Sequence, residues 1–256
     1  MSKAVRLDEL STHDFASALN SEKTSVVLLP IGSTEPHGPH LPLRTDVILA
    51  EANALRAAPQ FPEAFTVFVA PTLPYGVTDF AEGFAGAIGL TIETFTMVLE
   101  EIVAKFLDDG VDHVSIINHH LDPNHLKAIH HTLKKLWVRF GKRSVSHPSV
   151  LEPRWGRQLG HEFKSGACHA GAYEGSMVLA AEPELYQTDK AYSLPELTLS
   201  LSDGIRDGVE TFRALGMQDA YTGNPAASNA EFGNALLDVM CDMVITTVRE
   251  HVRSLP

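Results

Sequence analysis

Short apolar runs alternate along this chain with longer segments whose apolar residues recur at helical spacing. Runs rich in β-branched and aliphatic residues predict strands at residues 25–31, 66–70, 111–118 and 144–151. Helical spacing and capping residues predict helices at residues 46–58, 91–109, 123–140, 171–181 and 229–252. Residues 194–221 follow neither pattern, and we expect them to be irregular.

This alternation of strands and helices predicts a three-layer α/β fold, in which helices flank a mainly parallel central sheet. The sequence has no internal repeat, low-complexity tract or linker, so we expect one domain over residues 1–256. In such folds, ligands bind beyond the carboxyl ends of the strands. The loops after Ile31 and Ile117 leave those ends, and both are rich in side chains that bind metals.

Composition points to an ordinary globular protein with an acidic balance. Hydrophobic residues make up 44% of the 256 residues and charged residues 20%, and the formal net charge is −12. That charge argues against a nucleic-acid partner and against a polybasic membrane anchor. Residues 1–20 have no apolar signal core, and no run approaches the length of a membrane span. Because two cysteines are too few for a disulfide framework, we expect a cytoplasmic protein with reduced thiols.

The loop after the first predicted strand holds four of the chain's candidate metal ligands. Glu35, His37, His40 and Asp46 lie within twelve residues. In extended backbone, a spacing of two points the side chains of Glu35 and His37 the same way. Asp46 begins the next predicted helix, where its carboxylate could bridge two cations or simply cap the helix. Imidazole and carboxylate together suit Zn, Mn or Fe, and the alternative is a polar loop with caps.

A second candidate segment, residues 118–125, follows directly on another predicted strand. His119 and His120 are adjacent, so their side chains must point to different sides, and one could be a ligand while the other packs. Asp122 lies two residues beyond His120 and could join it. The alternative is a turn that caps the following helix.

The third segment, residues 168–176, is a loop of small residues that leads into an apolar helix. Glu174 lies near the start of that helix, where it could interact with the helix dipole or act as another metal ligand. His169 could carry protons, or it could pack or cap the loop.

These three segments resemble the motifs of the creatininase family. The first is close to Gly-Ser-x-Glu-x-His-Gly-x-His-Leu-Pro-x-x-Thr-Asp, and it matches at Gly32, Ser33, Glu35, His37, Gly38, His40, Leu41, Pro42, Thr45 and Asp46. The second is similar to Asn-Gly-His-Gly-Gly-Asn at Asn118 and His120. The third is similar to His-Ala-Gly-x-x-Glu-Thr-Ser at His169, Ala170, Gly171, Glu174 and Ser176. The chain departs from these patterns at His119, Leu121, Pro123 and Gly175.

The resemblance implies a creatininase-like fold that holds two divalent metal ions (Zn, Mn or Fe). The implied ligands, with Asp46 bridging the ions, are Glu35, His37, Asp46 and His120. A fifth ligand would be Glu174 or Asp122, and we prefer Glu174 because aspartate is one methylene shorter. His169 falls where the family has its catalytic acid/base histidine.

The implied substrate is a small amide, lactam or formamide, with a C–N bond other than an ordinary peptide bond, although one branch of the family trims peptides. Residues 76–87 lack the histidine and the Pro-Gly-Thr found in many members. Trp137 lies inside a predicted helix, which leaves Trp155 to replace the tryptophans that close over the substrate in creatininase. We therefore expect a substrate other than creatinine. The resemblance also implies a homo-oligomer, often a hexamer in this family. The alternative function is a non-catalytic metal-binding or assembly protein that has kept the fold.

Overall fold

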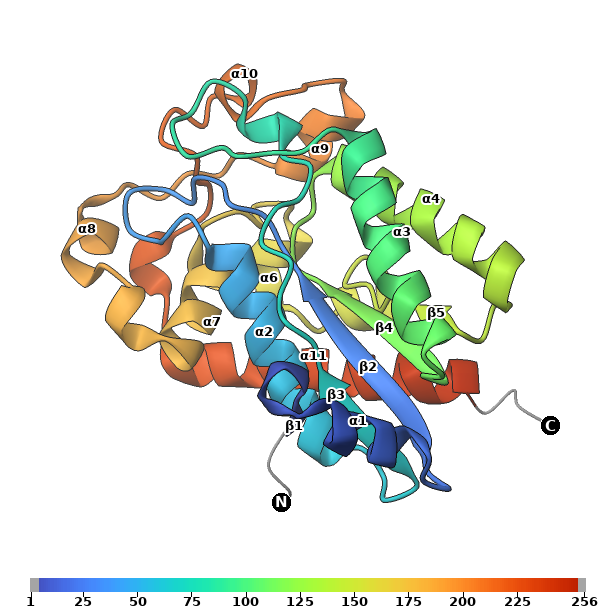
Figure 1. Ribbon diagram of the computed structural model, residues 1–256. Helices are drawn as coiled ribbons and strands as arrows, with labels where there is room; N and C mark the ends of the chain where they lie inside the picture. Colours follow the sequence, from blue (N-terminus) through green and yellow to red (C-terminus); the bar gives the residue numbers. More distant parts are fainter. Residues whose placement is uncertain (1–4, 253–256) are drawn as a thin grey trace.

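The computed structural model describes residues 5–252, so the first four residues of the segment expected to lack a signal core lie outside it. Its five strands form one parallel sheet in the order β1-β3-β2-β4-β5 (Figure 1). The strands are β1 (Val5–Arg6), β2 (Thr24–Ile31), β3 (Phe65–Val69), β4 (His113–Asn118) and β5 (Val145–Ser146). Ile31 lies opposite Asn118, so β2 and β4 end side by side and the loops that follow them begin at the same edge.

Six helices have eight or more residues. They are α1 (Thr12–Leu19), α2 (Thr45–Ala57), α3 (Ile92–Asp108), α4 (Pro123–Phe140), α7 (Ala172–Ala181) and α11 (Ala230–Val252). The shorter helices are α5 (Pro153–Gly156), α6 (Gly160–Lys164), α8 (Thr188–Ser193), α9 (Leu201–Arg206) and α10 (Phe212–Leu215). The 3-10 turns are η1 (Leu7–Glu9), η2 (Ala58–Gln60), η3 (Asp79–Ala81), η4 (Pro183–Leu185) and η5 (Pro225–Ala227). Within residues 5–252, no helix is both long and apolar enough to cross a membrane.

The central strand β2 is buried on both faces, which explains its unbroken apolar run. Val27 and Leu29 pack with apolar residues of α3 and α4 on one face. Val26 and Leu28 pack with apolar residues of α2 and α11 on the other. Because successive side chains of a strand point to opposite faces, this alternation produces the helix–sheet–helix layering. The predicted α/β fold with its mainly parallel sheet is therefore confirmed.

Two parts of the sequence-based prediction need correction. The strand expected at residues 144–151 is only the two-residue β5, and Pro148, which lacks the N–H that a ladder needs, follows closely. The segment expected to be irregular contains α9 and α10. Hydroxyl caps start both short helices, since Ser200 accepts from the N–H of Asp203 and Thr211 from that of Ala214.

Candidate metal centre

The loop between β2 and α2 places three candidate ligands at the carboxyl edge of the sheet. Glu35 and His37 lie on the loop, and Asp46 lies in the first turn of α2. At Gly32 a Cβ would lie 2.8 Å from the Cβ of Asp46, so only glycine lets the end of β2 pass this close to the helix. This close approach brings Asp46 beside the residues of the loop.

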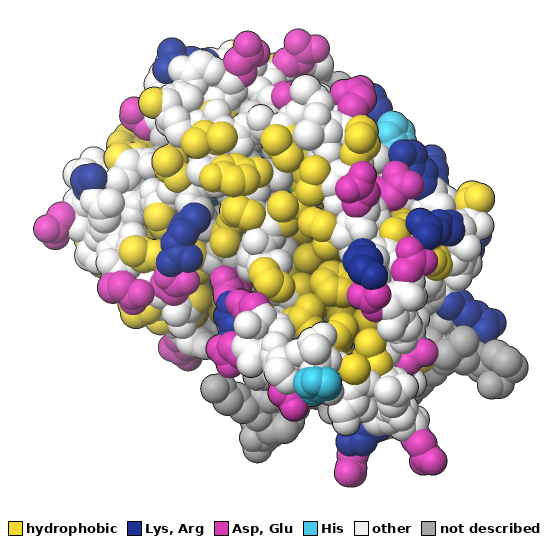
Figure 2. Space-filling model, viewed as in Figure 1, with side chains coloured by type: hydrophobic (Ala, Val, Ile, Leu, Met, Phe, Trp, Pro, Cys, Tyr) yellow, Lys and Arg dark blue, Asp and Glu magenta, His cyan; other side chains and the backbone are white. Residues whose placement is uncertain are grey.

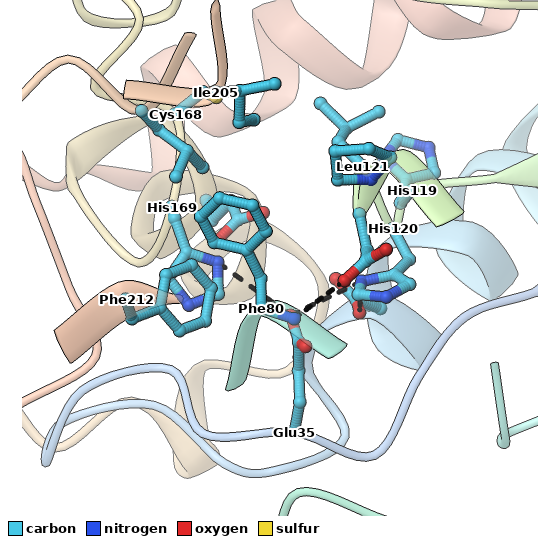
Figure 3. A pocket seen from close by; sticks show the side chains of 14 residues that line it. Glu35, Phe80, His119, His120, Leu121, Cys168, His169, Ile205 and Phe212 are labelled. Carbon is cyan, nitrogen blue, oxygen red and sulfur yellow. Dashed lines mark hydrogen bonds and ion pairs between the residues drawn. The ribbon is translucent and has the colours of Figure 1, made fainter. Parts of the chain in front are cut away.

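The end of β4 holds His120 through the side chain of Asn118. The Asn118 amide donates to the carbonyl of His120 at 2.7 Å, and its oxygen accepts from the N–H of His120 at 3.2 Å. His119 points away from His120 (Figure 3), as expected for adjacent positions. Its Nε2 accepts from the side-chain amide of Asn53 at 3.1 Å. Asn118 thus turns one histidine of the pair toward the loop after β2.

The loop before α7 supplies His169 and Glu174. Ala170 has a φ of 55°, in the left-handed region that disfavours residues other than glycine. In this conformation its N–H donates to Oε2 of Glu174 at 2.7 Å. The carbonyl of His169 accepts from the N–H of Thr222 at 2.9 Å, so a distant segment also fixes this loop.

The carboxylate of Asp46 lies between two imidazole rings, one facing each oxygen. Its Oδ1 is 3.4 Å from Nε2 of His37, and its Oδ2 is 3.0 Å from Nδ1 of His120. Oε1 of Glu35 is 3.3 Å from the same His120 nitrogen, and Oε2 of Glu174 is 3.6 Å from the same His37 nitrogen. The three segments therefore converge on Asp46.

His169 lies at the edge of this cluster, with its Nδ1 3.9 Å from Oε1 of Glu35. Figure 3 shows Glu35 reaching between His120 and His169. The ring of His169 stacks on Phe212 of α10, with 4.3 Å between ring centroids and 27° between planes. This stacking fixes the plane of the imidazole.

Backbone carbonyls orient all three imidazoles. Nδ1 of His37 donates to the carbonyl of Glu35 at 3.1 Å. Nε2 of His120 donates to the carbonyl of Val77 at 2.7 Å, and Nε2 of His169 donates to the carbonyl of Pro36 at 3.0 Å. A carbonyl oxygen can only accept, so each of these ring nitrogens carries a hydrogen. In the neutral ring the other nitrogen then offers its lone pair to the cluster, which is the arrangement found around metal-binding histidines.

The charges in this cluster are buried and shift one another's pKa values. Burial alone would lower the pKa of His37, but Asp46 and Glu174 outweigh it and raise that pKa to about 10. Burial raises the pKa of Glu174 to about 8. Burial also acts to raise the pKa of Asp46, yet His120 and His37 hold it well below its usual range. The buried carboxylates are therefore stable in their ionised form only when a positive charge lies beside them.

Two atoms at the centre of the cluster, Nε2 of His37 and Oδ2 of Asp46, are buried without a hydrogen-bond partner. A lone pair facing a carboxylate oxygen at these distances is repulsive unless a proton or a metal ion lies between them. Two sets of three ligand atoms, each set within 4.8 Å, share Asp46: Glu35, Asp46 and His120, and His37, Asp46 and Glu174. A third set is Glu35, His37 and His169. The donors fit metals that accept nitrogen and oxygen ligands.

Asp122 and His40 have other surroundings. Oδ1 of Asp122 accepts from the N–H groups of Asn124 and His125 at 2.7 and 3.3 Å, and its Oδ2 accepts from the N–H of Phe80 at 2.9 Å. Asp122 is therefore the N-cap of α4, and it belongs to none of the three ligand sets found among the described residues. His40 is buried near the ring of Tyr186 and is also outside these sets.

Sequence reasoning missed two residues that shape the site. Thr78 donates its hydroxyl to Oε2 of Glu35, which leaves Oε1 facing the cluster. Thr78 lies within residues 76–87, which the sequence marked only by the family residues that are missing. Phe212 belongs to the segment expected to be irregular, so no pattern marked it.

A pocket with about 390 Å³ of empty space, part of it open to solvent, lies over the cluster (Figure 3). The cluster forms its polar side, and Phe80, Leu121, Leu201, Ile205 and Phe212 form its apolar side. Neither tryptophan lines it: Trp137 donates to the carbonyl of Val145, and Trp155 packs in another apolar cluster. The replacement of the family's tryptophans by Trp155 is thus not found, and phenylalanines occupy the wall instead.

Comparison with known proteins shows the family to which the chain belongs. Residues 8–248 match the family described as Creatininase, creatinine amidohydrolase. A mycofactocin precursor peptide peptidase from Mycobacterium ulcerans is 29% identical over 255 residues, covering 94% of this chain and 91% of that protein. The creatinine amidohydrolase of Pseudomonas putida is 24% identical over 270 residues, with 98% of each chain covered. A solved structure named Creatininase Mn has a TM-score of 0.71 at 22% identity, covering 99% of this chain and 100% of that one. The chain therefore belongs to the creatininase family.

Proposed function

We propose that this protein hydrolyses the C–N bond of a small amide, lactam or formamide with the help of two divalent metal ions. The observation that carries the proposal is the position of the Asp46 carboxylate, which faces one imidazole nitrogen with each oxygen. Such a carboxylate can bridge two ions. The first ion would take Glu35 and His120, and the second His37 and Glu174.

Zn, Mn and Fe all suit this mixture of imidazole and carboxylate ligands. Manganese appears in the name of one related structure. Glu35, Asp46 and Glu174 would contribute three negative charges, which two divalent ions can balance within a buried site. Ions held there would lower the pKa of a shared water molecule and polarise the substrate carbonyl.

The protein's own residues would fix the geometry and move the proton. Thr78 holds Glu35 so that only Oε1 faces the cluster. Nε2 of His169 is committed to the carbonyl of Pro36, which leaves Nδ1 as the nitrogen that can take a proton from water and pass it to the leaving nitrogen. Phe212 stacks on this ring and limits its rotation. Water and an amide would thus become a carboxylic acid and an amine.

We propose that the substrate is not creatinine, because neither tryptophan of this chain reaches the pocket. A short peptide is the second candidate substrate. It is favoured by the relative from Mycobacterium ulcerans, which is named as a peptidase and matches 94% of this chain. A third reading is a non-catalytic metal-binding or assembly protein on the same fold.

We further propose that the protein forms a homo-oligomer through an apolar surface behind the first motif. Leu43, Tyr75 and Ile88 are 41%, 44% and 54% exposed. Their loops are joined because Thr34 accepts from the N–H of Ile88 and donates to the carbonyl of Pro74. Figure 2 shows a band of apolar side chains with few charges on this face. Such a band favours a second copy of the chain as partner.

The test of the enzymatic proposal begins with elemental analysis of gently purified protein, for which we expect two divalent ions per chain. Metal-replete protein is then screened against small cyclic and acyclic amides and short peptides. We expect hydrolysis that a chelator abolishes and that added metal restores. Tight metal binding without hydrolysis of any amide would favour the non-catalytic reading. Absence of metal, with hydrolysis unaffected by prolonged chelation, would exclude the dinuclear mechanism.

A further inference from the structure

The pocket over the cluster has an apolar wall that comes largely from outside the three motifs. Phe80 belongs to η3, Leu201 and Ile205 to α9, and Phe212 to α10. In Figure 3, Ile205, Phe80 and Phe212 lie on the side of the pocket that faces away from His120. The segment that the sequence pattern left unassigned therefore shapes the space where a substrate would lie.

This wall is packed rather than loose. The rings of Phe80 and Phe212 lie 5.6 Å apart at 63°, and both side chains are less than a tenth exposed. The N–H of Leu201 donates to the carbonyl of Gly166 at 2.8 Å, which ties α9 to the loop that carries His169. A preformed apolar wall favours an apolar group beside the reacting carbonyl, because a charged or strongly polar group would lose its hydration there.

A second, larger hollow adjoins the pocket and shares Phe80, Asp122, Pro123 and Ile205 with it. Three exposed carboxylates line this outer hollow, those of Asp79, Glu82 and Glu210. Among the described residues, no lysine or arginine lines either hollow. A substrate carboxylate would therefore meet three negative charges and no cationic side chain, whereas an ammonium group would be attracted.

We infer that the substrate is an amide with an aromatic or branched aliphatic group next to the scissile C–N bond, and with an amine rather than a carboxylate at its outer end. This inference rests on the proposed hydrolytic function of the same site. In the reaction, the oxygen of water bonds to the carbonyl carbon, the C–N bond breaks, and the leaving nitrogen gains a proton. The products are a carboxylic acid and an amine, or ammonia from a primary amide.

The test uses matched primary amides and the protein loaded with Mn²⁺, with ammonia release as the readout. N-β-alanyl-phenylalaninamide and N-succinyl-phenylalaninamide have the same two-methylene spacer but end in an amine and a carboxylate. N-β-alanyl-glycinamide lacks the apolar group. We expect kcat/KM for the first amide to exceed that for each of the others by roughly tenfold or more, since such contacts are worth about 1–3 kcal/mol.

Two charge-reversal variants make the test specific to the outer hollow. Glu210→Lys is expected to shift the ratio of kcat/KM values toward the succinyl amide by about tenfold, a change of about 1.4 kcal/mol. Glu231→Lys, in the first turn of α11 and outside both hollows, is the matched control and should leave the ratio unchanged.

The outcomes separate this inference from the proposed function. Equal rates on all three amides, or a preference for the succinyl or glycine compound, would overturn the inference while hydrolysis itself stands. An unchanged ratio in Glu210→Lys would remove the role of the outer carboxylates. If metal-loaded protein hydrolysed none of the three amides, the inference would be overturned, and the proposed function would fall with it only if the screen of cyclic amides, formamides and short peptides also showed no hydrolysis.

Discussion

Oδ2 of Asp46 lies 3.0 Å from Nδ1 of His120, and the other nitrogen of that ring is already committed to the carbonyl of Val77. A positive charge must therefore occupy the space between the two side chains. In metal-free protein that charge is a proton, because Glu35 and Asp46 outweigh the effect of burial and raise the pKa of His120 well above its ordinary value. In loaded protein a metal ion would replace it.

Metal uptake should therefore release protons. At pH 7.5, His37, with its pKa raised to about 10, and His120 are both protonated before metal binds and neutral afterwards. Glu174, with its pKa raised to about 8, is also mostly protonated at this pH and would lose that proton on becoming a ligand. We expect release of between two and three protons per chain, and an apparent metal affinity that rises with pH. Calorimetric titration with Mn²⁺ in buffers of different ionisation enthalpy measures this number. Release of no protons would mean that the ions bind away from these imidazoles.

Replacing Asp46 should have a larger effect on the metal centre than replacing any single histidine, since its carboxylate would contact both ions. We expect Asp46→Ala to lose both metals and all measurable hydrolysis. His40→Ala is the control, because His40 is buried nearby but lies outside the ligand sets. This control should keep its metals, although the cavity it creates lowers the free energy of unfolding. Loss of metal from His40→Ala and retention in Asp46→Ala would reverse the ligand assignment.

Replacing Glu174 and Asp122 by their uncharged amides should affect metal occupancy differently. Glu174 lies 3.6 Å from Nε2 of His37, so Glu174→Gln is expected to lower metal occupancy. Asp122 caps α4, so Asp122→Asn should keep the metals and cost about 1 kcal/mol of stability or less. Metal analysis and urea unfolding of both variants make the comparison. If Asp122→Asn were the variant that lost metal, Asp122 would be the fifth ligand.

His169→Ala should keep the fold and the metals but lower turnover by roughly 10²–10⁴, the usual contribution of a general acid–base residue. The reason is that Nε2 of His169 binds a backbone carbonyl, while its other ring nitrogen, Nδ1, lies beside Glu35. Metal content and a pH–rate profile are measured together. A variant without metal would make His169 a ligand, and a wild-type rate across the pH range would leave it without a catalytic role.

The proposed self-association has its own test. Ile88→Asp places a charge on the apolar surface behind the first motif, and we expect it to lower the molar mass in sedimentation or light scattering to that of a smaller species. Val138→Asp is the control, since Val138 is 90% exposed on α4, outside the loops that form this surface. A wild-type protein that is monomeric at micromolar concentration would contradict the proposal.

Much of the fold could be predicted because its main strands carry the pattern of a sheet covered on both faces. The runs that became β2 and β4 are apolar throughout. The sequence did not predict β1 or α1, which add a two-residue edge strand and a helix of eight residues. Elements this short contain too few apolar positions to establish a period. The single-domain organisation stays a prediction.

The candidate site was predictable where its residues are neighbours in the sequence and not where they meet only in space. Glu35, His37 and Asp46 lie within twelve residues of one another, so spacing alone grouped them. Glu174 and Asp122 could not be separated in this way, since both are carboxylates at a helix start. What distinguishes them is the N–H of Phe80, which reaches Asp122 from a different part of the chain.

The orientation of the three imidazoles depends on main-chain oxygens at Glu35, Pro36 and Val77, and every amino acid brings such an oxygen. Substitution at Pro36 or Val77 therefore changes a side chain without removing the acceptor, provided the backbone keeps its course. The wall of the pocket, by contrast, contains side chains such as Leu201 and Ile205, which do not contact these imidazoles through any ring or hydrogen-bond interaction. Under the proposed function, mutations in this wall would change which substrates are accepted while the backbone oxygens that orient the imidazoles stay in place. The scaffold would then be a favourable starting point for acquiring new substrates.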